Sequence, residues 1–218
     1  MAEEEKKASR KNDLIDWLKT ILIMLLIFLA SYLINQFVLS NNPISGNSMQ
    51  PNFQNGERVI AMRHTAIKRG DVVIIDAPDK PGEIYIKRVV GLPGEKLVSK
   101  NQQIYINGRK LPQPWLKQSR KLIDTEKGFE GLHYSTTQKF DLKRLTQTTA
   151  FSENTPSSDL SYIQKTGRIP KGTYFVMGDH RSISNDSRYI GVIPRSKVVG
   201  IVKLRYWPLN KISLIDNK

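Results

Sequence analysis

The longest hydrophobic stretch of the chain lies near its amino end. From Leu18 to Leu39 nearly every residue is apolar, without the spaced polar positions that give a surface helix its wet face. As a helix these 22 residues rise about 33 Å, enough to cross a hydrocarbon core of about 30 Å. Trp17 and Tyr32 are of the types that favour the membrane interfaces. The pattern predicts a transmembrane helix over residues 18–39.

A cleavable signal peptide is the main alternative for this stretch, because it too has a charged start and an apolar middle. The region before the span is long for a signal peptide, and no small-x-small cleavage site stands between the span and the motif around Ser48. The sequence therefore favours an anchor that is not removed.

Basic residues near the span predict its orientation. Five of them precede or open the span, namely Lys6, Lys7, Arg10, Lys11 and Lys19, and the next basic residue in the chain is Arg58. Flanks rich in Lys and Arg remain in the cytoplasm. We therefore expect a single-pass protein of the cell membrane, with residues 1–17 cytoplasmic, residues 18–39 in the bilayer and residues 40–218 extracytoplasmic.

Beyond the span the hydrophobic pattern is that of short strands. Runs rich in Val, Ile and Tyr, bounded by Gly, Pro, Asn or Asp, predict strands over 58–62, 71–75, 84–90, 103–106, 173–177 and 198–205. Between about residues 113 and 169 the composition shifts to Ser, Thr, Gln and Lys, with little periodicity. We expect a mainly β domain whose core covers about 43–112 and 170–208, with an insertion over about 113–169 that is partly ordered at most.

Charge and composition exclude several function classes. The net charge of +14 could indicate nucleic-acid binding, but no zinc spacing, recognition-helix pattern or RNA-binding aromatic motif accompanies it. A basic face turned toward anionic lipid or wall polymer accounts for the charge equally well. The absence of cysteine excludes disulfides and thiolate chemistry. With three histidines and no paired ligand spacing, we expect no metal and no other cofactor.

Ser48 and Lys87 are the two candidates for hydrolytic chemistry. Ser48 follows Leu39 by nine residues, which span at most about 30 Å, so it is tethered near the outer membrane surface. Lys87 lies in an apolar strand, with Tyr85 and Val89 on its face. A lysine with a pKa near 10.4 is almost never neutral at pH 7.5, but burial lowers that pKa by up to about 3–5 units and so makes a base that can deprotonate serine. A solvated strand lysine remains the ordinary alternative.

Five motifs, in order behind the anchor, decide between these readings. They are Ser45-Gly46-Asn47-Ser48-Met49-Gln50-Pro51, Gly56-Glu57-Arg58-Val59, Arg69-Gly70-Asp71-Val72-Val73, the run from Tyr85 to Glu95, and Gly178-Asp179-His180-Arg181 through Asn185-Asp186-Ser187-Arg188. In these five motifs the chain resembles the type I signal peptidases, membrane-bound Ser/Lys proteases that remove signal peptides from exported proteins. The single anchor and Gly46 resemble the Gram-positive branch. The resemblance implies a signal-peptidase-type β-sheet catalytic core, and it does not cover the insertion.

Carried over position by position, the resemblance implies a role for each site residue. Ser48 would be the nucleophile and Lys87 the general base, and Ser184 would hydrogen-bond and orient the lysine amine. Asp186 and Arg188 would form a supporting ion pair, and Gly178 would let its segment pass close to the site. Without the resemblance, the loop carrying these last residues is an ordinary polar surface loop.

The same resemblance implies the substrate. Ile44, Met49 and Ile86 would line a shallow pocket that admits small side chains, so the expected partner is the signal peptide of an exported preprotein with small residues at the first and third positions before the cut. Membrane lipid is the other expected partner, and no nucleic acid is. The backbone N–H of Ser48 would bind the oxyanion. A second donor is not identified, because Gly46 stands where another branch of the family has a serine.

The sequence alone leaves alternatives to this mechanism and function open. A Ser/His/Asp triad through His180 and Asp179 is disfavoured because adjacent residues point apart, and His64 and His133 are expected at the surface. The chain could instead be another Ser/Lys peptidase, akin to the self-cleaving repressors, although it has an anchor and lacks a DNA-binding helix pair. It could also be a non-enzymatic anchored module that binds anionic polymers, a role that needs neither Ser48 nor Lys87.

Overall fold

The computed structural model describes residues 2–216, with side chains described from Asp16 onward except that of Asn35. The chain divides into two compact units, one ending at Leu39 and the other beginning at Ser40.

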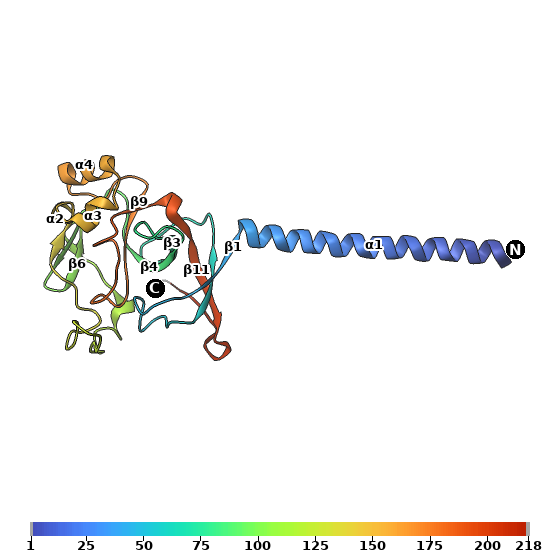
Figure 1. Cartoon of the computed structure of the whole chain (residues 1–218), viewed down its shortest axis with the longest axis horizontal. Helices are drawn as coiled ribbons and strands as arrows, with labels where there is room; N and C mark the ends of the chain where they lie inside the picture. Colours follow the sequence, from blue (N-terminus) through green and yellow to red (C-terminus); the bar gives the residue numbers. More distant parts are fainter. Residues whose placement is uncertain (1, 217–218) are drawn as a thin grey trace. The chain divides into compact units, whose positions relative to one another are not determined.

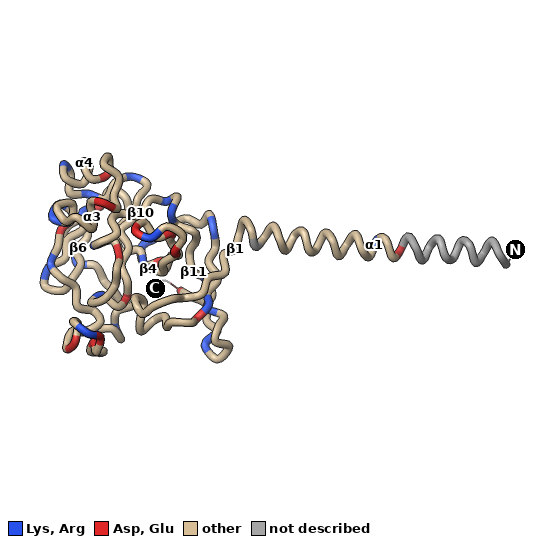
Figure 2. The backbone as a smooth tube through the Cα atoms, viewed as in Figure 1, with Lys and Arg blue, Asp and Glu red and all other residues tan. Residues whose placement is uncertain are grey.

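The first unit is one helix, α1 (Ala2–Phe37). Its segment Asp16–Ile34 is long and apolar enough to cross a membrane, and the sequence carries no charged residue from Thr20 to Gly56 (Figure 2). The helix ends earlier than the predicted span, because Leu39 already begins strand β1 (Leu39–Pro43). The side chains of Lys6, Lys7, Arg10 and Lys11, on which the predicted orientation depends, lie outside the described residues.

The second unit is built on one large sheet (Figure 1). Its strands run in the order β1-β2-β11-β3-β4-β9-β10, with β12 paired to β11. After β1, their bounds are β2 (Arg58–Met62), β3 (Val72–Asp76), β4 (Ile84–Gly91), β9 (Thr173–Met177), β10 (Ile193–Pro194), β11 (Val198–Trp207) and β12 (Ser213–Leu214). Pairing of β11 with β2 and β3, and of β4 with β3 and β9, is antiparallel. The mainly β class predicted from the sequence is confirmed.

A second, smaller sheet has the order β7-β6-β5-β8. Its strands are β5 (Leu97–Lys100), β6 (Gln103–Ile106), β7 (Arg109–Lys110) and β8 (Phe140–Asp141). The helices α2 (Leu142–Leu145), α3 (Thr149–Glu153) and α4 (Ser157–Thr166) group near β6 (Figure 1). Short 3-10 turns cover Pro114–Leu116, Arg195–Lys197 and Leu209–Lys211.

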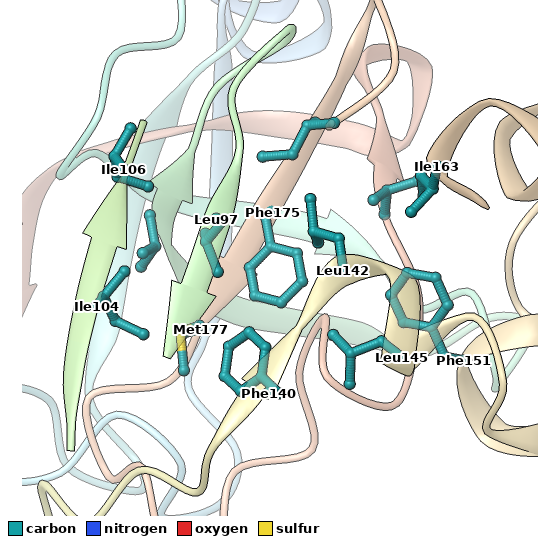
Figure 3. Packing of buried hydrophobic residues seen from close by; sticks show 13 residues of the cluster. Leu97, Ile104, Ile106, Phe140, Leu142, Leu145, Phe151, Ile163, Phe175 and Met177 are labelled. Carbon is teal, nitrogen blue, oxygen red and sulfur yellow. The ribbon is translucent and has the colours of Figure 1, made fainter. Parts of the chain in front are cut away.

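The expectation that residues 113–169 are partly ordered at most is wrong. Strand β8 and all three short helices fall in this region, and Phe140, Leu142, Phe151 and Ile163 pack in one buried cluster with Phe175 of β9 (Figure 3). Elements of four to ten residues contribute only one or two buried positions each, too few to show a period in the sequence. The apolar side chains that they do bury join the region to the large sheet.

Candidate active site

Strand β4 places Lys87 in the interior of the second unit. The strand lies between β3 and β9, with Lys87 opposite Val73 and Arg88 opposite Met177. Alternation along the strand sends these two neighbouring cations to opposite faces. Lys87 is only 3% exposed, and its Nζ donates a hydrogen bond of 2.8 Å to Ser48 Oγ. The two residues singled out in the sequence are therefore brought into direct contact.

Burial makes Lys87 an unusual lysine. Desolvation lowers the pKa of its amine to about 8, against the attraction of Asp186 and Asp79, which favours the charged form. The aromatic ring of Tyr85 lies 5.1 Å from Nζ. A lysine with this pKa has a substantial neutral fraction near pH 8, and a neutral amine can accept the proton of a serine hydroxyl.

The loop carrying Ser48 is fixed on both sides of the serine. Before it, Gly46 has a positive φ of 86°, which favours glycine, and its N–H donates to Asn55 Oδ1. After it, the carbonyl oxygen of Ser48 accepts a hydrogen bond of 3.0 Å from the backbone N–H of His180. Within residues 2–216 no acceptor occupies the N–H of Ser48 itself. That N–H is therefore free to donate to a ligand.

The segment after β9 packs tightly against this loop. A Cβ at Gly178 would collide with the carbonyl oxygen of Ser48 and with Ser184 Oγ, so only glycine fits there. The N–H of Gly178 donates to Asp186 Oδ2 at 3.0 Å. Arg188 donates two hydrogen bonds to the same carboxylate, from Nε at 2.8 Å and from Nη2 at 2.9 Å. Gly178, Asp186 and Arg188 thus form one buried hydrogen-bonded unit beneath the serine.

The electrostatics of this unit favour a charged Asp186. Burial raises the pKa of its carboxyl group, but Arg188 and the N–H of Gly178 outweigh burial and hold the pKa below its ordinary value.

Ser184 Oγ is buried and has no hydrogen-bond partner within the described residues. The expected bond from Ser184 to the lysine amine is therefore not formed in this structure.

Asp179 forms an ion pair with Arg88, which the sequence did not predict. Its carboxylate accepts from Arg88 Nε at 2.8 Å and Nη2 at 2.6 Å, and from Asn52 Nδ2 at 2.8 Å. The Arg88 guanidinium also lies 5.1 Å from the Trp115 ring. This buried bidentate pair ties β4 to the segment after β9. Only the placement of Arg88 on the face opposite Lys87 could have suggested it.

Breaking this pair should destabilise the fold. Asp179→Ala leaves the Arg88 charge buried without its carboxylate, which typically costs about 3–5 kcal/mol. We expect the free energy of unfolding in denaturant to fall by that amount. The control is Glu83→Ala, which removes an exposed partner of Lys80 and should change the free energy by less than about 1 kcal/mol. Equal losses for both variants would contradict this assignment.

His180 pairs with Asp124 from the inserted region. The distance from its Nε2 to Asp124 Oδ2 is 2.8 Å, both side chains are fully buried, and the imidazole stacks on Tyr134 with ring centroids 3.6 Å apart. His180 contacts neither Asp179 nor Ser48 through its side chain, so the Ser/His/Asp triad is not formed. His64 and His133 are exposed, as expected. The Asp124 contact could not be foreseen, because it comes from a region without periodicity.

A pocket of about 310 Å³ opens beside Ser48 and Lys87. Its lining comes from four segments, with Ser45, Gly46, Asn47, Ser48, Lys80, Tyr85, Ile86, Lys87, Glu126, Ile183 and Asn185. Ile86 lines the pocket as expected. Ile44 and Met49 are not part of this lining, and their side chains are buried in a core cluster with Phe53, Val59 and Ile86 itself. The structure thus corrects two of the three predicted wall residues and adds Glu126, Ile183 and Asn185.

Known proteins resemble this chain along most of its length. A family model described as signal peptidase, peptidase S26, matches residues 14–207. Signal peptidase I of Bacillus licheniformis is 33% identical over 218 residues, which cover 98% of this chain and 99% of the relative. Signal peptidase IB of Staphylococcus aureus is 32% identical over 205 residues, which cover 92% and 93%. A crystal structure of a signal peptidase I from Enterococcus faecalis V583 aligns with 28% identity and a TM-score of 0.46, over 63% of this chain and 97% of that one.

Proposed function

Because this chain belongs to the signal peptidase family S26, we propose that it is a membrane-anchored serine endopeptidase that removes signal peptides from exported preproteins. Ser48 is the nucleophile and Lys87 the general base. The observation that carries this assignment is the 2.8 Å bond between Lys87 Nζ and Ser48 Oγ, made by a buried lysine whose pKa is lowered to about 8. This contact puts an amine that titrates near neutral pH within hydrogen-bond reach of the serine hydroxyl, as a general base requires.

The reaction follows from this geometry. Neutral Lys87 takes the proton of Ser48 Oγ as that oxygen attacks the scissile carbonyl carbon. Negative charge then develops on the carbonyl oxygen, and the free N–H of Ser48 donates to it. The lysine ammonium returns its proton to the departing amine, the new amino terminus leaves, and a water activated by Lys87 releases the signal peptide from Ser48. Gly46 offers no hydroxyl, and its N–H is already committed to Asn55.

The buried unit beneath the serine supports the dyad. Gly178 lets its segment approach the carbonyl of Ser48, and the Asp186–Arg188 pair fixes that segment. The negative charge of Asp186 also limits how far burial lowers the Lys87 pKa. Ser184 Oγ, a buried hydroxyl without a hydrogen-bond partner in the described part of the chain, is available to orient the lysine amine. We therefore retain all four as supporting residues.

The substrate is a signal peptide with small residues at the first and third positions before the cut. Ile86 belongs to the lining of a pocket of about 310 Å³ next to Lys87, and a small pocket selects small side chains by steric exclusion of larger ones. Helix α1 anchors the enzyme, with its amino end cytoplasmic and the site outside. Since a signal peptide occupies the same membrane, a short tether from the anchor presents Ser48 where the cut site emerges.

The pH profile tests the role of Lys87. Only the neutral amine can act as base, so kcat/KM for a preprotein should rise about tenfold per pH unit below the Lys87 pKa and level off above about pH 8. The measurement is initial cleavage rate from pH 6 to 9.5, with a substrate whose residues near the cut do not titrate. A profile that is flat across pH 8, or that falls there, would exclude Lys87 as the base.

A further inference from the structure

A short hairpin from the inserted region reaches the pocket. Ile123 and His133 form an isolated antiparallel bridge. Between them, Asp124 N donates to Leu132 O at 2.7 Å, and Gly131 N donates to Asp124 O at 3.1 Å. We call residues 123–133 the insertion hairpin. None of the five motifs that singled out Ser48 and Lys87 lies in this segment, so its contribution to the site is seen in the structure.

Asp124 attaches the insertion hairpin to the segment after β9. Its Oδ2 accepts from His180 Nε2 at 2.8 Å and Ser182 Oγ at 2.6 Å, and its Oδ1 accepts from the N–H of Glu126 at 3.1 Å. Burial raises the pKa of Asp124, but these hydrogen bonds outweigh burial and keep the pKa low. Because the N–H of His180 also holds the carbonyl of Ser48, one set of contacts fixes both the nucleophile loop and the hairpin.

This attachment brings Glu126 to the wall of the pocket. Its Oε1 accepts a hydrogen bond of 3.1 Å from Asn47 Nδ2, next to Ser48 in the chain. Its Oε2 has no partner within the described residues. The described pocket lining includes two cations, Lys80 and Lys87, and Glu126 as its one carboxylate. The Lys80 ammonium lies 3.6 Å from Glu83, so it is already matched by a carboxylate outside the pocket.

We propose that Glu126 is a specificity residue that selects a basic side chain close to the scissile bond of the substrate. The proposal rests on the proposed function and goes beyond it, since small residues at the first and third positions say nothing about charge. An exposed carboxylate with one free oxygen can pair with a lysine or arginine at little desolvation cost, and it repels an acidic side chain in the same place. Positions −1 and −3 require small residues. The side chain that pairs with Glu126 is therefore expected at position −2, +1 or +2 around the cut.

The test is a charge scan of the substrate. Peptides carry Lys, Gln or Glu in turn at positions −2, +1 and +2, and kcat/KM is measured for the wild type, Glu126→Gln and Glu126→Lys. At the position that faces Glu126, the wild type should favour Lys over Glu by about three- to tenfold. Glu126→Gln should remove the preference and Glu126→Lys should invert it. The wild-type preference should shrink in 1 M salt, where the screening length is about 3 Å.

The matched control is Glu130→Gln. Glu130 lies in the same hairpin, outside the pocket lining, and its Oε2 accepts from the N–H of Gly128, so the preference should be unchanged in this variant. The same preference in wild type and Glu126→Gln would overturn the proposal. So would equal loss of kcat on all peptides in Glu126→Gln, which would make Glu126 a positioning residue acting through Asn47. Failure of the wild type to cleave any of the peptides would instead count against the proposed function.

Discussion

Lys87→Met should cleave a preprotein with a kcat about 10³-fold below that of the wild type. The substitution keeps the length of the side chain but removes the amine that holds Ser48 Oγ at 2.8 Å, and loss of a general base typically costs 10²–10⁴-fold. KM should change much less, because Lys87 is only 3% exposed and so offers little surface for binding the substrate. The measurement is the single-turnover rate of cleavage by the full chain in detergent.

Measuring the stability of Lys87→Met distinguishes loss of the general base from unfolding of the protein. In the folded protein the pKa of about 8 lies below the ordinary lysine value of 10.5, so burial of the charged amine is unfavourable by about 3 kcal/mol below pH 8. This penalty fades as the pH rises toward 10.5, where the amine is neutral in both states. At pH 7 the variant should therefore be at least as stable as the wild type.

Lys87→Arg should also be inactive, since a guanidinium cannot become neutral. Activity within tenfold of wild type in either variant would contradict the Ser/Lys mechanism.

Ser48→Ala should abolish cleavage. Loss of the nucleophile leaves no group to form the acyl intermediate, and removal of a serine nucleophile in a comparable protease lowers kcat by about 10⁶-fold. Because Ser48 is only partly buried and Lys87 stays beneath it, the fold should persist, as judged by thermal unfolding. Ser158→Ala, an exposed serine of α4, is the control and should keep full activity. Residual cleavage by Ser48→Ala at more than about 1% of the wild-type rate would point to another nucleophile.

The sequence predicted six strands because they are apolar and bounded by turn residues. All six are present, five in the large sheet and β6 in the smaller one, with ends displaced by at most two residues. Ser48 and Lys87 could be paired only through motifs, since they lie 39 residues apart and neither shows its partner locally. The sequence did not predict the short strands β1, β5, β7, β10 and β12 or the elements of the inserted region. These elements are short, and tertiary packing rather than local pattern decides their structure.

The direction in which individual side chains point was the second feature that the sequence could not predict. Ile44 and Met49 flank the nucleophile in sequence, which suggested a pocket wall, but the tight loop turns both into the core. Asp179 could have faced either His180 or Arg88, and the choice depends on how β9 and β4 pair. Glu126 comes close to Ser48 through the contacts of Asp124 and its own hydrogen bond with Asn47. In each case the missing information is a long-range contact, which local patterns do not contain.

The most direct measurement of the central claim is the mass of the products from a preprotein with a defined signal peptide, incubated with the detergent-solubilised full chain. The account predicts two fragments whose masses place a single cut after a small residue, with another small residue two positions earlier, and no fragments with Ser48→Ala or Lys87→Met. An intact preprotein with the wild type, a cut elsewhere, or the same fragments from Lys87→Met would contradict it.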